Sequence, residues 1–433
     1  MKLPIAWIAT VLCLTFNCFS PIPSARAEGL DCSRPADSLP HPDIKPGTSD
    51  PNIPIEHIVV IMQENHSFDA YFGRLNEPRY YGAEVDGLRP EMSNPDKTGT
   101  PVHPFHHKVL CVNDTAHTWN ASHLTWNGGL MDQFVVQNGH RSMGSFNDKD
   151  IPYYYALANE FAIGDRYFSS LLSMTDVNRY FLYAATAFGQ VENSDPPNKH
   201  QWDQKTIFDV LDQYGISWKY YRSDSGYIKN FASVREHDQK KMVPVSRFKK
   251  DLKHGHLPQV VFIESLDNIE DEHPSIDIQF GQNWVANRIK ELMTSKYWQS
   301  SALFFTYDEA GGYFDHVAPP PACVPDGIAP RLAQGDYPGA YDRYGFRVPF
   351  VVVSPYAKKH YVSHVTFDHT SILKFIETKF NLPALTLRDA NANAPFDLFD
   401  FTNPAHLLPP KLPSGQFSWG RILQCIFRNR FES

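Results

Sequence analysis

The stretch "VVIMQENHSFDAYFG", from Val59 to Gly73, passes from an apolar run to a polar one within a few residues. Its apolar part shows no regular alternation, which is typical of a strand buried on both faces of a sheet. Glu64 and Asn65 follow directly where this strand would end. Open parallel sheets bind ligands beyond the carboxyl ends of their strands. This stretch therefore indicates both the fold and the place of a site.

Apolar runs of strand length recur along the chain, and helical patterns lie between them. The runs of strand length are 57–63, 160–168, 216–222, 259–265, 302–308 and 348–354. The helical patterns are 175–187, 205–214, 279–297 and 369–380. Strands that alternate with helices imply crossover connections between parallel strands. We therefore expect an α/β fold with a mostly parallel central sheet and helices on both faces.

Two long stretches fit neither pattern. Residues 74–158 are rich in His, Asn, Gly and Trp, and residues 317–346 carry prolines throughout. Loops of this length in a compact domain are usually functional covers or disordered segments. No stretch resembles a linker, so we expect residues 28–433 to form a single domain.

The first residues have the pattern of a removed secretory signal peptide. Lys2 gives a short positive region, residues 5–19 are apolar, and Ala25-Arg26-Ala27 matches a cleavage site. No later stretch approaches the ~18 uninterrupted apolar residues of a membrane-spanning helix. We therefore read residues 1–27 as a signal peptide and expect an exported protein, periplasmic or secreted, without a transmembrane segment.

Charge and cysteine content limit the classes of partner and compartment. The chain of 433 residues has a formal net charge of −8, which becomes −10 without Lys2 and Arg26. Nucleic-acid binding needs a basic face, so we expect no nucleic acid as a partner. Two disulfides would suit an oxidising compartment, in any of three pairings. The four cysteines that remain after residue 27 are Cys32, Cys111, Cys323 and Cys425.

Polar residues gather where other predicted strands end. One strand ends in Asp308-Glu309, and "QVVFIES" is followed by the segment 271–273, "DEH". An isolated acidic pair is most often a charged turn or a helix cap. Two pairs at the ends of buried strands, Asp308-Glu309 and Glu64-Asn65, predict instead a metal site built from hard oxygen ligands.

Thr175 opens the helical pattern "TDVNRYFLYAATAFG". Threonine is a common N-cap, and that is the ordinary structural explanation. A helix N-terminus is also an anion site, and a hydroxyl that touches a divalent metal can attack phosphorus. Because the acid pairs supply the metal site, we interpret Thr175 as a nucleophile. Asn178 and Arg179 follow one turn later on the same side of the helix.

Histidines form a second tier of candidates. A phosphoryl-transfer site needs hydrogen-bond donors for the phosphoryl oxygens and an acid for the leaving group, and histidine can serve both needs. A lone histidine is more often a buried, hydrogen-bonded core residue. We expect these roles first for His123 and His273, and less for His117, His316 and His369.

Seven motifs together resemble one known family. They are "ENHSFDAYFG", "HTWNASHLTWNGGLMDQF", "SLLSMTDVNRY", "DEHP", "DEAGGYFDHVAPP", "RVPFVVVSPYA" and "FDHTSILKFIE". In this order they resemble the bacterial phospholipase C and acid phosphatase phosphoesterase family, within the alkaline phosphatase superfamily. The resemblance covers residues from about 54 to about 382.

The resemblance implies an alkaline-phosphatase-like α/β fold and the hydrolysis of phosphate esters with one divalent metal ion. The ion could be Mg, Mn, Ca, Fe or Zn. By motif, the metal ligands would be Glu64, Asn65, Thr175, Asp308 and Glu309. Thr175 would also be the nucleophile, with His123 and His273 contacting the phosphoryl group.

The chain departs from the usual family pattern at four positions. His66 stands where the family commonly has Arg, Met174 and Val177 replace two prolines beside Thr175, and Ala310 replaces a frequent His. None of the expected ligand or nucleophile positions is changed. These departures bear on substrate preference more than on activity.

The sequence thus predicts an exported, metal-dependent phosphoric ester hydrolase with a threonine nucleophile. Phospholipase C action on a phosphodiester lipid, with a head group bound at a membrane surface, is the first expectation. A broad-specificity acid phosphatase acting on phosphomonoesters is the alternative. A different class, an inactive protein that binds phosphate or another anion, would be expected to have lost Thr175 or an acid pair, and both are present.

Overall fold

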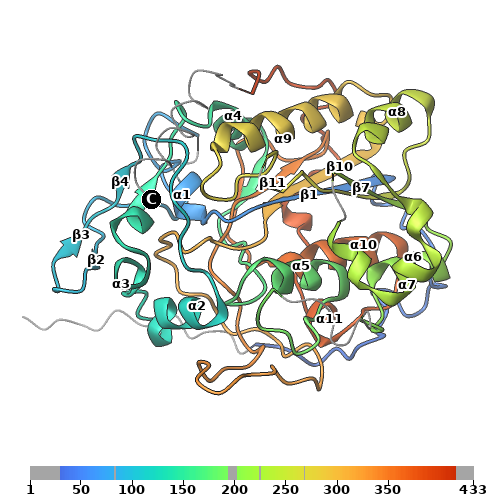
Figure 1. The fold of residues 1–433 in the computed structure, drawn as a ribbon. Helices are drawn as coiled ribbons and strands as arrows, with labels where there is room; N and C mark the ends of the chain where they lie inside the picture. The colour runs from blue at the N-terminus through green and yellow to red at the C-terminus, as the bar shows by residue number, and fades with distance from the viewer. Residues whose placement is uncertain (1–29, 82–83, 194–201, 224–225, 268, 416–433) are drawn as a thin grey trace, which may run out of the picture. The chain divides into compact units, whose positions relative to one another are not determined.

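The computed structural model describes residues 30–81, 84–193, 202–223, 226–267 and 269–415 (Figure 1). The expected signal peptide, residues 1–27, lies outside the described residues, as does Cys425. The residues from Asp31 onward belong to one compact unit. No helix in the described ranges is long and apolar enough to cross a lipid bilayer.

The core of the fold is a sheet whose strands follow the order β12-β6-β11-β10-β1-β9-β7-β8. The strands are β1 (His57–Gln63), β6 (Ala162–Gly164), β7 (Trp218–Arg222), β8 (Met242–Pro244), β9 (Val260–Ile263), β10 (Ser301–Tyr307), β11 (Phe350–Val353) and β12 (Val362–Ser363). Only β11 runs antiparallel to its neighbours. The expectation of a mostly parallel sheet is therefore confirmed.

The sequence did not predict the two edge strands, β8 and β12, and it overestimated the length of one inner strand, β6. β8 and β12 contain three and two residues, too few to give an apolar run. The run 160–168 contributes only the three residues of β6. Edge strands can be this short because just one neighbour has to be matched.

The register of the central strands brings their ends together. In β1, Gln63 pairs with Tyr307 of β10, and Ile61 pairs with Ile263 of β9. All three strands are parallel, and every residue in them except His57 is buried. The residues that follow them therefore emerge at one edge of the sheet, as the sequence predicted.

Helices cover both faces of the sheet (Figure 1). One face carries α4 (Pro152–Glu160), α8 (Ser246–His254) and α9 (Ile278–Met293). The other carries α5 (Thr175–Ala184), α6 (Ile207–Gln213), α7 (Ala232–His237), α10 (His369–Phe380) and α11 (Leu387–Ala390). The four helical patterns of the sequence correspond to α5, α6, α9 and α10. α10 has the predicted bounds, whereas α5, α6 and α9 are shorter than predicted.

Residues 74–158 hold more regular structure than their sequence pattern suggested. They contain α2 (Trp119–Trp126), α3 (Phe134–Asn138), most of α4, and the short strands β2 (Asn94–Pro95), β3 (Pro101–Val102), β4 (Phe105–His106) and β5 (Gly144–Ser145). α2 is hard to recognise because apolar and polar residues are mixed around it. By contrast, residues 317–346 form neither a helix nor a strand, as expected.

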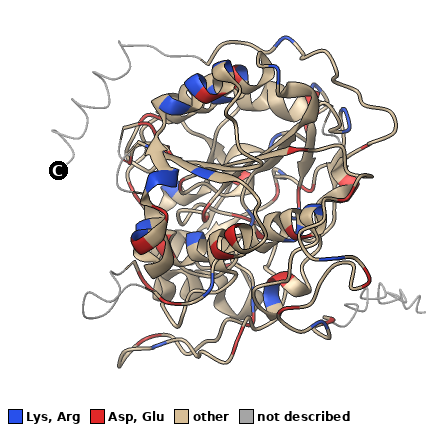
Figure 2. Cartoon of the chain, turned by 90° about the vertical axis from the view of Figure 1, so that its right-hand side faces the viewer, with Lys and Arg blue, Asp and Glu red and all other residues tan. Residues whose placement is uncertain are grey.

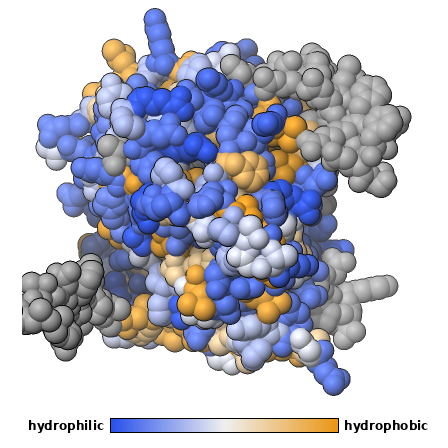
Figure 3. Space-filling model, turned by 90° about the vertical axis from the view of Figure 1, so that its left-hand side faces the viewer, coloured by the Kyte–Doolittle hydropathy of each residue, from blue (hydrophilic) through white to orange (hydrophobic). Residues whose placement is uncertain are grey.

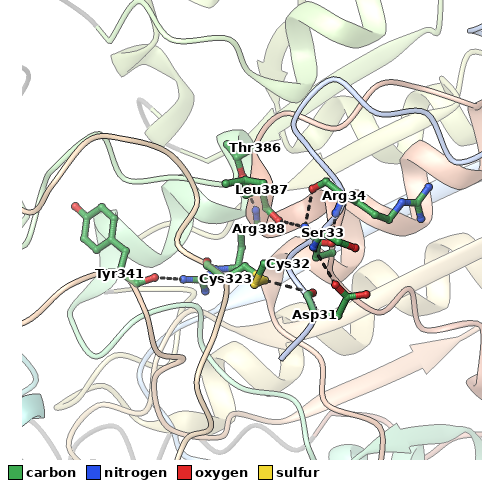
Figure 4. Close-up of a disulfide and its surroundings, with 10 residues drawn as sticks. Asp31, Cys32, Ser33, Arg34, Cys323, Tyr341, Thr386, Leu387 and Arg388 are labelled. Carbon is green, nitrogen blue, oxygen red and sulfur yellow. Dashed lines mark hydrogen bonds between the residues drawn. A yellow bond between two sulfur atoms is a disulfide. The ribbon is translucent and has the colours of Figure 1, made fainter. Parts of the chain in front are cut away.

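A disulfide joins Cys32 to Cys323, with their Cα atoms 5.7 Å apart (Figure 4). This selects one of the pairings that the sequence left open, and Cys111 is disulfide-bonded as well. The buried Arg388 holds the same region by donating from Nε to the Cys323 carbonyl at 2.5 Å and from Nη2 to the Tyr341 carbonyl at 2.5 Å. The start of the described chain is thereby tied to the loop 317–346.

Charged and apolar residues are both mixed with other kinds of residue in the described part of the chain. Figure 2 shows Lys and Arg interspersed with Asp and Glu along the helices. On the face seen in Figure 3, apolar side chains lie in separate groups among hydrophilic ones.

Candidate active site

The two acid pairs predicted from the sequence lie in contact at the carboxyl edge of the sheet. The backbone N–H of Asn65 donates to Oδ1 of Asp308 at 3.1 Å. The backbone N–H of Glu309 donates to the same oxygen at 2.7 Å. One carboxylate oxygen therefore joins the end of β1 to the end of β10.

The backbone around Asn65 explains why an asparagine and a glycine stand there. Asn65 has φ of +61°, a left-handed conformation that asparagine tolerates better than most residues. Gly311, also at φ +61°, lies so close that a Cβ there would be 2.2 Å from the Asn65 carbonyl oxygen. The two loops can cross at this distance only without a side chain at position 311.

Several buried oxygens at this edge make no hydrogen bond within the described part of the chain. They are Oδ1 of Asn65, Oδ2 of Asp308 and Oε1 of Glu309. Burial, followed by the nearby charge of Glu64, raises the pKa of Asp308 to about 7. Burial and the charge of Asp308 also raise the pKa of Glu309. Buried acceptors without donors are unfavourable, and a hard divalent cation would satisfy them, so these residues fit a metal ion.

Arg179 lies among the carboxylates of this edge and balances part of their charge. Its guanidinium donates from Nη1 to Glu264 at 2.6 Å and from Nη2 to Glu64 at 3.1 Å, with Nε 3.6 Å from Oδ2 of Asp308. The side chain is fully buried and stacks over the Tyr227 ring at 4.3 Å. A second-tier prediction is thus brought into the centre of the site.

Glu264 is a site residue that the sequence reasoning missed. The predicted strand 259–265 included it, whereas β9 ends at Ile263. Its carboxylate therefore emerges at the same edge as Glu64, where it pairs with Arg179 and accepts a hydrogen bond from Tyr183 at 2.5 Å. The available signal was its place at the end of an apolar run, as for Glu64.

Thr175 is the first residue of α5 and does not cap it. The N-cap is Met174, and no side chain makes a capping hydrogen bond there. The ordinary explanation of Thr175 as an N-cap is therefore wrong. Thr175 lines a cavity of about 360 Å³ at the helix N-terminus. The cavity is lined by Glu64, His117, Met174, Thr175, Asp176, Asn193, Tyr227, Asp267, Asp271 and His273.

Asn178 fixes the loop that leads into Thr175. Its Oδ1 accepts from the Leu171 N–H at 2.9 Å, and its Nδ2 donates to the Ser173 carbonyl at 2.9 Å and the Met174 carbonyl at 3.2 Å. The side chain is fully buried. The Asn178 side chain thus supplies hydrogen-bond partners to backbone groups that have no partner in a regular helix or strand.

Two histidines stand beside the cavity. His273 and His117 have ring centroids 5.9 Å apart, and Nε2 of His117 is 4.0 Å from Oε1 of Glu309. Burial lowers the pKa of His273, but the charges of Glu64 and Asp114 outweigh burial and raise it. His273 can therefore carry a proton beside the cavity.

The other predicted histidines lie elsewhere. His123 has Nδ1 2.8 Å from the Trp119 carbonyl and stacks on Tyr337, and it does not line the cavity. His369 has Nε2 2.7 Å from the backbone carbonyl oxygen of Asp308, so it contacts the backbone of this residue and does not line the cavity. His316 sits between Asp69 and Asp86, at 2.7 and 2.9 Å. His117, not His123, occupies the position beside His273.

The departure at His66 has a packing explanation. Its ring stacks on Tyr313 with centroids 4.7 Å apart and lies 4.4 Å from the Tyr71 ring. Burial lowers the pKa of His66 to about 3, so the ring is neutral. His66 therefore contributes an aromatic face to the packing under the site.

Acidic residues line one side of the cavity, and Asp267 is the one among them that the sequence did not indicate. Carboxylate oxygens of Glu64, Asp267 and Asp271 lie within 4.8 Å of one another. The Tyr227 hydroxyl donates to Oε1 of Glu64 at 2.8 Å and lies 3.5 Å from Asp267. The cavity thus combines a helix N-terminus and two histidines with a negatively charged wall.

Comparison with known proteins identifies relatives over most of the chain. A profile of the Phosphoesterase family matches residues 55–383, almost the range expected from the motifs. "Non-hemolytic phospholipase C" of Burkholderia pseudomallei is 32% identical over 389 residues, which are 76% of this chain and 55% of the relative. "Non-specific phospholipase C1" of Arabidopsis thaliana is 33% identical over 85% of this chain and 76% of its own length.

A further relative and one solved structure complete the comparison. "Phospholipase C B" of Mycobacterium tuberculosis is 30% identical over 86% of this chain and 83% of its own length. The chain thus spans only about half of the Burkholderia relative but most of the other two. A protein in the alkaline phosphatase superfamily from Vibrio parahaemolyticus aligns over 83% of this chain and 71% of its own, with a TM-score of 0.39 and 9% identity.

Proposed function

Because this chain belongs to the phosphoesterase family and is therefore a hydrolase of phosphoric esters, we propose that it is a metal-dependent phospholipase C with a threonine nucleophile. The observation that carries this proposal is the cavity shared by Glu64, Thr175 and His273. It borders the buried, unsatisfied oxygens of Asn65, Asp308 and Glu309 through the contact between His117 and Glu309. The nucleophile and the proton donor of this proposal thus line one cavity with Glu64, and the further proposed metal ligands lie beside it.

The ligand set consists of oxygens from Glu64, Asn65, Thr175, Asp308 and Glu309. A divalent ion held there would lower the pKa of the Thr175 hydroxyl and offset the negative charge of the phosphoryl oxygens. Oxygen ligands suit Mg, Mn, Ca and Fe, and Zn also accepts them.

In the first step, Thr175, whose hydroxyl proton has passed to solvent, forms a bond from its oxygen to phosphorus, and the bond from phosphorus to the leaving-group oxygen breaks. The N–H groups at the start of α5 face the phosphoryl oxygens and stabilise their charge. His273 gives its proton to the leaving oxygen. In the second step, water attacks the phosphothreonine, His273 recovers a proton from that water, and Thr175 is released.

The acidic wall of the cavity favours a diester with a cationic head group over a phosphomonoester. Asp176, Asp267 and Asp271 line the cavity together with Glu64. A phosphomonoester dianion meets repulsion from these carboxylates, whereas a phosphocholine or phosphoethanolamine group can place its cation against them. The Tyr227 ring offers an aromatic face for the same cation.

Export belongs to this proposal as well. The disulfide between Cys32 and Cys323 suits an oxidising compartment. The substrate would then be a phospholipid head group at a membrane surface, reached by the enzyme from outside the cytosol. Comparing the mature N-terminus of the secreted protein with residue 28 tests this part, and a chain that retains residues 1–27 would contradict it.

The decisive experiment compares a phosphorylcholine diester with a phosphomonoester as substrates of the purified protein, with and without a chelator. We expect diester hydrolysis that the chelator abolishes and that a divalent ion restores. Thr175→Ala should reduce kcat by at least about a thousandfold. Thr378→Ala, which removes a half-buried helical hydroxyl bonded to the Lys374 carbonyl, is the matched control and should leave kcat unchanged.

Each part of the proposal has its own contradicting outcome. Full activity of Thr175→Ala would eliminate the nucleophile. A preference for the phosphomonoester would favour the acid phosphatase alternative. Binding of phosphate without hydrolysis of either ester would favour an inactive anion-binding protein.

A further inference from the structure

Glu272 lies between two residues that line the cavity, yet its own side chain takes no part in the lining. Asp271 and His273 both border the cavity, whereas the Glu272 carboxylate is fully buried beneath them. The mechanism proposed above does not use it. Its hydrogen bonds nevertheless join it to three segments that lead to or pack against residues of the site.

Three tyrosine hydroxyls converge on this one carboxylate. Oε2 of Glu272 accepts from Tyr71 at 2.5 Å and from Tyr307 at 2.7 Å, and Oε1 accepts from Tyr154. All three tyrosines are fully buried. Hydrogen bonds to a buried carboxylate are stronger than those between neutral groups and set a narrow geometry.

Each tyrosine belongs to a different segment. Tyr307 is the last residue of β10 and directly precedes Asp308. Tyr71 ends α1 (Phe68–Tyr71), the short helix that follows Glu64 and Asn65. Tyr154 is on α4, which packs against α9. One carboxylate thus links the segment of His273 to both acid pairs and to the helical layer.

The helix above Glu272 is built to make room for it. α9 carries Gly281 in its interior, where glycine lowers helix stability relative to alanine. A Cβ at position 281 would lie 2.2 Å from Cγ of Glu272. The glycine is explained by this close approach, which leaves Glu272 a single place to occupy.

We propose that Glu272 is a positioning residue that fixes His273 and Asp271 relative to the ligands Asp308 and Glu64. The proposal rests on the function proposed above, because it concerns the same site. It differs from a purely structural role in one respect. If Glu272 acts through His273, its loss changes the rate of the chemical step and not merely the stability of the fold.

The test replaces Glu272 by Gln in the full-length, metal-loaded enzyme and measures hydrolysis of the phosphorylcholine diester. A glutamine NH2 group cannot accept from a tyrosine hydroxyl, so at least one of the three bonds is lost. We expect kcat to fall by about 10–100-fold, with KM changed by less than about threefold. An unchanged kcat would overturn the proposal.

Two further variants keep the test decisive if Glu272→Gln folds poorly. Tyr307→Phe removes one donor and no charge, and Gly281→Ala pushes against Glu272 without altering any of its bonding groups. Both should lower kcat with little change in KM. The matched control is Asp251→Asn, a buried carboxylate that accepts from the Tyr221 hydroxyl at 2.8 Å and lies on α8. It should lower the Tm and leave kcat unchanged.

A double-mutant cycle with His273→Ala separates positioning from structure. If Glu272 acts by placing His273, removing His273 from the Glu272→Gln enzyme costs far less activity than removing it from the wild type. Equal costs in the two backgrounds would overturn the proposal. Retained activity in Thr175→Ala would instead contradict the proposed function, so the two failures are distinguishable.

Discussion

Two buried groups of carboxylates lie at the carboxyl edge of the sheet and in its neighbouring loops, and they differ in how far their charges are paired. We call the first, around Arg347, the complete network and the second, around Arg179, the incomplete group. In one, Asp69 and Asp315 are paired with Arg347 at 3.1 and 2.8 Å, and His316 bridges Asp69 and Asp86. In the other, the carboxylates around Arg179 leave oxygens of Asp308 and Glu309 without a hydrogen bond within the described residues.

The difference shows how to distinguish a charged network that stabilises the fold from one that can bind a metal ion. Asp69, Asp315 and His316 bring potential ligand atoms as close together as a metal site would. Arg347 and His316 already pair with the two carboxylates, so a metal ion bound there would form no contact that these carboxylates still lack. The group around Asp308 has acceptors left over, which is the property of a site that takes a ligand.

The largest expected effect comes from breaking the complete network. Arg347→Met would leave Asp69 and Asp315 buried without their partner, which costs about 3–5 kcal/mol in the free energy of unfolding. Urea denaturation measures this directly. A loss below about 1 kcal/mol would mean that the network is not what holds these loops.

The incomplete group should respond to a metal ion where the complete one does not. After treatment with a chelator, adding a divalent ion at a hundred times its Kd should raise the free energy of unfolding by about 2.7 kcal/mol. Asp308→Asn should abolish this increase, whereas Asp315→Asn should keep it. The increase is measured as a shift in Tm, and its persistence in Asp308→Asn would contradict the assignment.

A smaller effect separates the two histidines of the segment around α2. His117→Ala removes a ring beside the cavity and should lower kcat by about 10–100-fold. His123→Ala removes a ring that packs on Trp119 and Tyr337, so kcat should stay within about threefold of the wild type. Steady-state kinetics of the two variants side by side decide between them, and the reverse ranking would restore the assignment made from the motif.

The smallest effect is a dependence of stability on pH within the complete network. Burial lowers the pKa of His316, but its hydrogen bonds to Asp69 and Asp86 outweigh burial and raise it from the ordinary 6.5 to about 9. Because the folded value is higher, this stabilisation is complete below pH 6.5 and is lost as the pH rises through about 9. The Tm of His316→Gln should depend less on pH across this range than the Tm of the wild type. An equal dependence of Tm on pH in both proteins would contradict the pairing of His316 with Asp69 and Asp86.

Much of the fold was readable from the sequence because its central strands are long and uniformly apolar. β1 and β10 were predicted almost to the residue, and their ends gave Glu64, Asn65, Asp308 and Glu309. β8 and β12 were missed because two or three residues carry no pattern. The helices within 74–158 were missed because their residues do not form one apolar stripe; in α2, the polar Ser122 and Thr125 are buried while Leu124 is exposed.

Site residues were predictable where they directly follow a strand. They were less predictable where the packing of separate segments determines which side chains reach the site. Glu264 was hidden because β9 ends at Ile263, two residues before the end of the predicted strand 259–265. Sequence motifs could not rank His117 above His123, because only the path of α2 determines which ring reaches the cavity. The tyrosines around Glu272 come from three separate segments and have no joint signal in the sequence.

The central claim is that the edge formed by β1 and β10 holds a divalent ion, and metal content measures it most directly. Elemental analysis of the purified protein, of Glu309→Gln and of Asp315→Asn should give one ion per chain in the wild type and in Asp315→Asn. It should give a much lower content in Glu309→Gln. Equal metal content in Glu309→Gln and the wild type, or loss of the ion in Asp315→Asn alone, would contradict the account.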